Sequence, residues 1–143
     1  MDTEKNGGDM LLRVTTDDDG IIHIRMQGNL SEDHLTEVSE WADEVRVAMR
    51  QAFARNPRRV LTLIDVTGAF EADAKTMEVL HSLMVHNKDY ATRTAVFGAT
   101  YFIKMIVEAA IRATMRSNMA IFTTRDEALE WLLRDPSDTS RAD

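Results

Sequence analysis

The sequence predicts an α/β domain with its elements in the order β-β-α-β-α-β-α-β-α. Residues 60–66 form a short apolar run rich in β-branched residues, bounded by Pro57 and Gly68, which is typical of a strand buried on both faces. Helical patterns precede and follow this run, so we expect it to be the central strand. The connections have the length that right-handed crossovers between parallel strands require.

Composition indicates one soluble domain with a sizeable core, because the 143 residues are 44% hydrophobic and 29% charged. A formal net charge of −7 argues against binding to nucleic acid, whose phosphates require a surplus of Lys and Arg. The absence of cysteine excludes disulfides, thiolate metal sites and cysteine nucleophiles. No apolar run reaches the roughly 18 residues of a membrane span, and the first residues lack the pattern of a signal peptide, so we expect a cytoplasmic location.

The first elements are predicted from composition and alternation. Residues 1–9 hold little that could be buried, and we expect them to be a disordered tail. Residues 10–16 and 21–27 are predicted to form a hairpin around the acidic turn at 17–20. Apolar and polar residues alternate in the second strand, which places His23 at the solvent or against a neighbouring strand.

A long helix is predicted after Ser31, whose hydroxyl is expected to cap its first turn. Apolar residues then recur at steps of three and four, from Leu35 to Phe53, and form one stripe. Trp41 lies at the edge of this stripe and is expected to be partly buried. Pro57 ends the helix, because the residue before a proline is disfavoured in the helical region.

A helix over 72–87 and a buried strand over 94–99 follow the central strand. The next helix, over 101–117, is apolar around an unusually wide arc. Such an arc is explained by packing between the sheet and a neighbouring helix, by a dimer surface, or by one wall of a pocket for an apolar ligand.

The last elements are a strand over 119–123 and a short helix that ends at Leu133. Thr124 and Glu127 have the spacing of a capping box at the start of this helix. Residues 135–143 are expected to be a second disordered tail, so that residues 10–134 make a single domain.

The sequence lacks the motifs of common catalytic and cofactor sites. There is no nucleophile elbow, no phosphate-binding loop and no dinucleotide-binding glycine motif. His81 and His86 are five residues apart and do not share a helix face, so no metal site is predicted. Asp65 and Asp73 follow the central strand without a nucleophile beside them, and turn or cap roles suit them equally well. We therefore expect no enzyme activity and no cofactor.

The order of elements and two segments resemble a known family. The strand end Leu-Thr-Leu-Ile-Asp-Val-Thr-Gly at 61–68, with Asp73 eight residues after its aspartate, and the segment 122–132 are similar to STAS domains. The likeness is greatest to the SpoIIAA-like branch of small stand-alone bacterial proteins and covers about residues 10–133. This family includes the anti-sigma factor antagonists. The resemblance implies a mixed sheet wound with helices and a regulatory role in binding a partner protein.

In those antagonists, a serine at the start of the helix after the central strand follows an aspartate. A partner kinase phosphorylates it, and the added charge blocks binding. Asp73 matches that aspartate, and the phosphoacceptor position falls on Ala74 or Lys75, neither of which has a hydroxyl. The resemblance thus implies a partner-binding surface without this switch. Its residues are Asp65, Thr67, Gly68, Asp73, Ala74, Lys75, Thr76, Gly98 and Thr100.

The alternative is a carrier or sensor of an apolar small molecule or lipid, since the SpoIIAA-like branch also resembles in fold the lipid-exchange domains of Sec14 type. It would use the broad apolar face of helix 101–117. An open cavity of roughly 300 Å³ or more would favour this function. A homodimer is compatible with both. The expected pocket or interface residues are Phe70, Met77, Phe102, Ile103 and Ile106.

Overall fold

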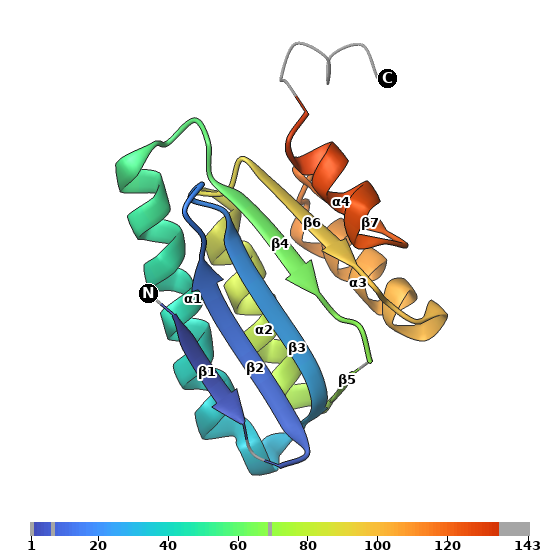
Figure 1. The fold of residues 1–143 in the computed structure, drawn as a ribbon. Helices are drawn as coiled ribbons and strands as arrows, with labels where there is room; N and C mark the ends of the chain where they lie inside the picture. Colours follow the sequence, from blue (N-terminus) through green and yellow to red (C-terminus); the bar gives the residue numbers. More distant parts are fainter. Residues whose placement is uncertain (1, 7, 69, 135–143) are drawn as a thin grey trace.

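The computed structural model describes residues 2–6, 8–68 and 70–134. Within them one seven-stranded sheet is covered by four α-helices (Figure 1). The strands are β1 (Thr3–Asn6), β2 (Met10–Thr16), β3 (Ile22–Leu30), β4 (Leu61–Asp65), β5 (Phe70–Ala72), β6 (Arg93–Phe97) and β7 (Met119–Phe122). The helices are the 3₁₀ turn η1 (Glu32–His34) and α1 (Leu35–Arg55), α2 (Ala74–Lys88), α3 (Tyr101–Thr114) and α4 (Arg125–Leu132).

The sheet is mixed, as the resemblance to STAS domains implies. Its order is β1-β2-β3-β4-β6-β7. The pairs β1–β2 and β2–β3 are antiparallel, and the remaining pairs are parallel. The long strand β3 pairs with β4 through Ile22 to Arg25 and with β5 through Gly28 to Leu30. Between β4 and β5 the chain therefore leaves the sheet and returns to it further along β3. The predicted fold class is confirmed, with β1 and β5 as additional strands.

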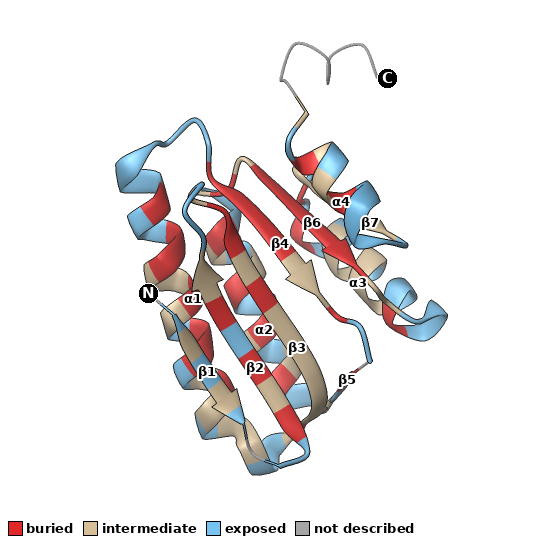
Figure 2. Ribbon diagram, viewed as in Figure 1, coloured by how far each residue is buried: buried red, intermediate tan, exposed pale blue. Residues whose placement is uncertain are grey.

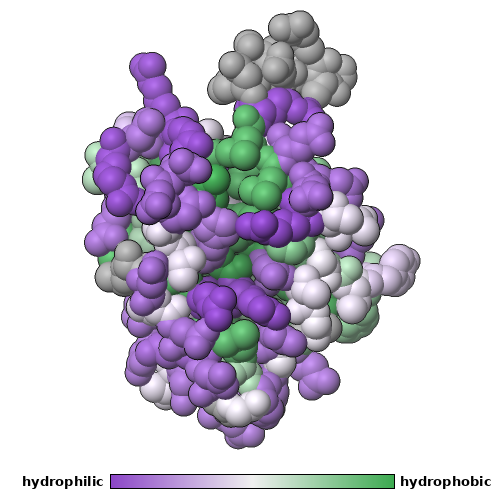
Figure 3. Space-filling model, in the orientation of Figure 1, coloured by the Kyte–Doolittle hydropathy of each residue, from purple (hydrophilic) through white to green (hydrophobic). Residues whose placement is uncertain are grey.

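The helices lie in two layers. Helices α1 and α2 cover one face of the sheet, and α4 lies on the other (Figure 1). Alternation along β4 serves both layers, since Leu61 and Leu63 pack in one cluster with Leu132 of α4, while Ile64 packs against the larger core with residues of α1 and α2. Both central strands, β4 and β6, are buried along most of their length (Figure 2). The face of the molecule that carries α4 is mostly hydrophilic, with a smaller apolar patch beside α4 (Figure 3).

Local sequence signals set the helix ends. The predicted capping box is confirmed: the Glu127 N–H donates to Thr124 Oγ1, and Glu127 in turn accepts from the Thr124 N–H. Helix α1 ends at Arg55, just before Asn56 and Pro57, as predicted. Ser31 is different, because its side chain makes no cap hydrogen bond and a 3₁₀ turn stands between it and α1. Trp41 is fully buried rather than partly buried.

The expectation of a disordered tail over residues 1–9 is wrong for the described residues of that segment. Strand β1 pairs with β2 in the register Thr3 to Val14, and Lys5 Nζ lies 2.9 Å from Glu40 Oε2 of α1. The Asp9 carboxylate accepts a hydrogen bond from Asn29 Nδ2 at 3.2 Å. An edge strand is held by its backbone ladder and needs no apolar side chains, so composition did not reveal it. The expected tail at 135–143 lies outside the described residues.

Candidate functional site

The carboxyl ends of β4 and β6 form one candidate surface, here called the strand-end rim, made of residues 65–68 and 98–102. The two strands are parallel neighbours, with Asp65 opposite Phe97. The Val66 N–H donates to the Phe97 carbonyl at 3.1 Å, and the Thr67 N–H donates to Asp65 Oδ1 at 2.8 Å. Ligands of open α/β sheets bind at such strand ends.

Gly98 allows the two loops of the rim to touch. Its φ of +83° lies in the left-handed region, where a side chain is disfavoured. A Cβ at this position would lie 2.1 Å from Thr67 Oγ1. Because Gly98 has no side chain, Thr67 packs directly against the backbone that leads into α3.

The first turns of helix α3 expose three large apolar or aromatic side chains beside the rim. The Ile103 N–H donates to Thr100 Oγ1 at 3.3 Å, which caps the helix, and Ile103 itself is only 2% exposed. Tyr101, Phe102 and Met105 are 80%, 70% and 53% exposed. The wide apolar arc of this helix is therefore not explained by packing between the sheet and a neighbouring helix alone.

The other predicted surface residues, Asp73 to Thr76, lie apart from the rim, at the far end of the loop and of β5 (Figure 1). Asp73 Oδ1 accepts from the Thr76 N–H at 3.0 Å and so caps α2, while Oδ2 accepts from the Glu32 N–H of η1 at 2.5 Å. These backbone donors, first that of Thr76, hold the pKa of the Asp73 carboxyl below its ordinary value. Asp73 thus joins two helix starts.

The residues after Asp73 have separate environments. Ala74 is exposed, and the Lys75 ammonium lies 2.9 Å from Glu32 Oε1 on the surface. Thr76 is fully buried, so its hydroxyl is shielded from a kinase in the folded protein. Thr67, in contrast, is exposed at the rim.

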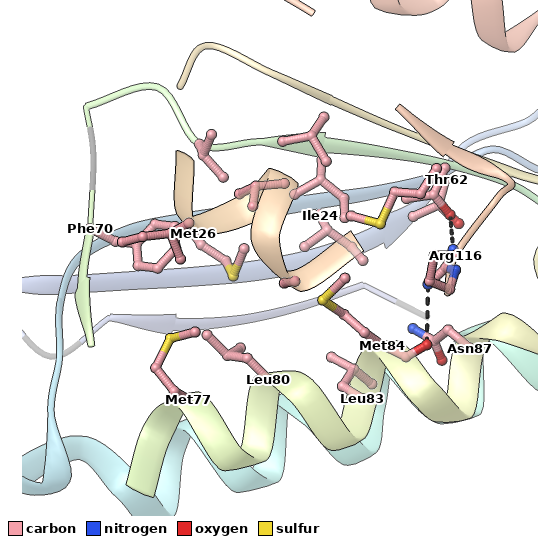
Figure 4. Close-up of a pocket in the computed structure, with 18 of the residues that line it drawn as sticks. Ile24, Met26, Thr62, Phe70, Met77, Leu80, Leu83, Met84, Asn87 and Arg116 are labelled. Carbon is pink, nitrogen blue, oxygen red and sulfur yellow. Dashed lines mark hydrogen bonds between the residues drawn. The ribbon is translucent and has the colours of Figure 1, made fainter. Parts of the chain in front are cut away.

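A second candidate site is an apolar cavity of about 90 Å³ between the sheet, α2 and α3 (Figure 4). This volume is well below the roughly 300 Å³ expected of an ordinary ligand pocket. Of the residues expected to form a pocket or interface, Phe70, Met77 and Ile106 line this cavity. Ile103 is instead buried in the core and Phe102 points to solvent, so neither forms the pocket wall expected of it. Five methionines also line the cavity: Met26, Met49, Met77, Met84 and Met119.

Sequence reasoning missed the polar end of this cavity. Arg116, Thr62 and Asn87 lie together at the end opposite Phe70 and Met77 (Figure 4). Arg116 is only 3% exposed, and burial lowers the pKa of its guanidinium to about 10. Thr62 is a polar residue inside the apolar run 60–66, and this was the one sequence signal of a polar group in the core. Arg116 gave no such signal, because basic residues are common near helix ends.

The part of the chain that the structure describes holds neither a cluster of metal ligands nor a membrane-spanning helix. In residues 2–6, 8–68 and 70–134, no three His, Asp or Glu side chains are grouped closely enough to hold a metal ion. Over the same residues, no helix has both the length and the apolar character needed to cross a membrane.

Solved structures with the same fold include two kinds of protein. An uncharacterised DUF3478 protein with a SpoIIAA-like fold from Shewanella loihica matches 91% of this chain and 98% of its own, at 16% identity and a TM-score of 0.61. An anti-sigma factor antagonist from Mycobacterium paratuberculosis matches 91% and 100%, at 16% identity and a TM-score of 0.52. The phosphorylated form of the Bacillus cell fate determinant SpoIIAA matches 84% and 97%, at 12% identity and a TM-score of 0.51.

These likenesses define the fold as that of the anti-sigma factor antagonists, the STAS fold. The sequence itself matches the SpoIIAA-like family over residues 21–133, and the chain belongs to this family. No curated protein matches the sequence.

Proposed function

We propose that the protein is a non-enzymatic regulatory module that binds a partner protein through the strand-end rim and the adjoining turn of α3. The observation that carries this proposal is the exposure of Tyr101, Phe102 and Met105 next to the loop at Thr67 and Gly68. Aromatic residues and methionine are enriched at the centres of protein interfaces, where a few side chains supply most of the binding energy. The likeness in fold to an anti-sigma factor antagonist supports a protein partner.

Binding at this rim does not depend on phosphate at the start of α2. The Bacillus relative occurs in a phosphorylated form. By the family resemblance the phosphoacceptor position of this chain falls on Ala74 or Lys75, and the next hydroxyl, on Thr76, is buried. Asp73 is engaged in backbone hydrogen bonds to two helix starts. We infer that the family's phosphate switch is lost at this position and that the rim is constitutively available.

A capture experiment with matched variants tests the rim. Tagged wild type, Phe102→Ala and Val85→Ala are exposed to lysate of the native organism, and retained proteins are quantified by mass spectrometry. Val85 is the control because it is an apolar residue that is 49% exposed and lies near the carboxyl end of α2, outside the rim. The proposal predicts one protein retained by wild type and Val85→Ala and reduced about tenfold or more by Phe102→Ala, the effect of removing a hot spot. Equal retention by all three proteins would contradict it.

A second copy of the chain is the competing occupant of the α3 face. Native mass spectrometry of the purified protein separates the two cases. A dimer that Phe102→Ala converts to a monomer would place a homodimer contact on the rim, against the proposal of a different partner. The proposal predicts that wild type and Phe102→Ala have the same oligomeric state.

A second candidate function is binding of an apolar small molecule in the cavity between α2 and α3. Its support is the composition of the wall, in which five methionines and further apolar side chains from α1, α2, α3 and the sheet converge. Methionine is flexible and polarizable, so such a wall adapts to a ligand larger than the cavity of about 90 Å³. A small mass that accompanies the native protein in gentle mass spectrometry and is released on denaturation would support it.

A further inference from the structure

We propose that the cavity between α2 and α3 takes an apolar ligand with one carboxylate head, whose head pairs with Arg116 and Thr62. The inference rests on the second candidate function above and names the chemistry of its ligand. Its starting point is a buried positive charge with no buried negative charge beside it, at the polar end of an otherwise apolar cavity (Figure 4).

Arg116 reaches the cavity from the turn after α3. Met115, just before it, has a φ of 57°, a left-handed conformation that is unusual for a residue with a side chain. The Arg116 N–H closes the helix end by donating to the Ile111 carbonyl at 3.0 Å. Beyond this turn the Arg116 side chain contacts Met84 of α2 and Thr94 of β6.

The neutral partners of Arg116 use only part of its hydrogen-bonding capacity. Nε donates to Asn118 Oδ1 at 2.9 Å, one terminal nitrogen donates to the Met84 carbonyl at 3.2 Å, and the other donates to Thr94 Oγ1 at 2.9 Å. A guanidinium has five N–H donors, so two remain without an acceptor among the described residues. Arg116 itself is one of the residues that line the cavity.

No carboxylate neutralises this cation within residues 2–6, 8–68 and 70–134. Neither Asp nor Glu lines the cavity, and no acidic side chain of the described chain forms an ion pair with Arg116. A buried, unpaired charge is strongly unfavourable, and native proteins usually pair such groups or bind an ion there. An anionic ligand supplies the missing charge.

Thr62 gives an independent indication of a polar group at the same place. Its Oγ1 is buried without a hydrogen-bond partner in the described protein. It is the direct cross-strand neighbour of Thr94, which already accepts from Arg116. A carboxylate placed against Arg116 has two oxygens, which suit the two free guanidinium N–H groups and the Thr62 hydroxyl.

The remainder of the cavity defines the body of the ligand. From Asn87 at the polar end to Met77 at the far end, the α2 residues in its wall span about 15 Å of helix, at 1.5 Å per residue. The wall along this stretch is apolar, from Leu83 and Leu80 to Phe70. A straight or branched hydrocarbon chain fits along α2 with its carboxylate at Arg116, and the methionines move aside to widen the space.

The test compares octanoate with octanol, which have the same chain and differ in the head group. Their binding to the full-length protein is measured by isothermal titration calorimetry. We expect octanoate to bind roughly tenfold to a hundredfold tighter, the effect of charge-assisted hydrogen bonds. Equal affinities would overturn the head-group inference and leave the apolar-ligand function standing. Failure of both compounds to bind would overturn that function and the inference together.

The variant Arg116→Gln assigns the preference to this side chain. In this variant octanoate should no longer bind more tightly than octanol. The affinity of octanol should equal its affinity for wild type, because octanol carries no charge that pairs with Arg116. Arg112→Gln is the matched control, because Arg112 is an exposed arginine in the last turn of the same helix. An unchanged advantage of octanoate in folded Arg116→Gln, or an equal loss in Arg112→Gln, would overturn the assignment.

A measurement on wild type alone keeps the inference testable if Arg116→Gln does not fold. Octanoate labelled with ¹³C at its carboxyl is titrated with acid in the bound state and followed by NMR. Pairing with Arg116 should hold the pKa of the bound carboxyl below that of free octanoate. A raised pKa of the bound acid, as burial without a cation produces, would contradict the pairing.

Discussion

Gly98 shows how one residue without a side chain shapes the strand-end rim. Gly98 and Gly20 have nearly the same φ, +83° and +84°, but only Gly98 faces a neighbour where a Cβ would be, the Thr67 hydroxyl. Gly98→Ala should lower the free energy of unfolding by about 1–3 kcal/mol, from backbone strain and the contact together. Gly20→Ala, the control, should cost less because its surroundings are open. Chemical denaturation measures both, and equal losses would contradict the close approach of Thr67.

Asp73 provides a pH-dependent prediction. Because its folded-state pKa is lowered, the stability that its charge contributes is present above the ordinary carboxyl pKa, about 3.9, and is lost as the pH falls through the folded value. Asp73→Asn should therefore melt at a lower temperature than wild type at neutral pH, and the difference should shrink in acid. Asp18→Asn is the control, since Asp18 lies exposed in the β2–β3 turn. A difference from wild type that stays constant with pH would show that the charge of Asp73 does not matter.

At the scale of elements, α3 is attached by few buried side chains. Ile103→Ala should destabilise the protein by about 2–5 kcal/mol, as loss of a buried aliphatic side chain does, because Ile103 is part of the main core. Met105→Ala, two positions on and exposed, should change the stability by no more than about 0.5 kcal/mol. Thermal or urea unfolding compares the two variants. Similar losses would mean that the outer face of α3 is buried in solution, by a second copy or by closure of the helix.

The elements that sequence alone revealed are those with a local signal. The apolar run of β4, the Thr124 capping box and the break at Pro57 each depend on residues close in sequence, and each was predicted. Strand β1 has polar residues throughout and is defined by pairing with β2, while β5 has only three residues. Periodicity cannot detect either.

The candidate sites were predicted less well, because they depend on distant contacts. The ends of β4 and β6 are neighbours because the two strands are parallel, so sequence reasoning could place Thr67, Gly68, Gly98 and Thr100 close together. Asp73 contacts Glu32 across forty-one residues of sequence, and Arg116 reaches Thr94 of β6 and Met84 of α2. Such contacts arise only once the sheet and helices are assembled.

For the whole molecule, the two candidate sites share α3. Its outer residues Tyr101, Phe102 and Met105 belong to the exposed face beside the rim, whereas Ile106 and Val107 line the cavity on its inner side. An occupant of the cavity therefore contacts the same helix that a protein partner would contact from outside. Binding at one site has a direct physical route to the other through the position of α3.

The most direct test of the rim is hydrogen–deuterium exchange of the protein with and without the partner identified by capture. Binding at the rim predicts slower exchange in residues 66–68 and 100–105 and unchanged exchange in β1 and the outer face of α1. Slower exchange confined to β1 and α1, with the rim unaffected, would contradict the proposed function and place the interface at the β1 edge of the sheet.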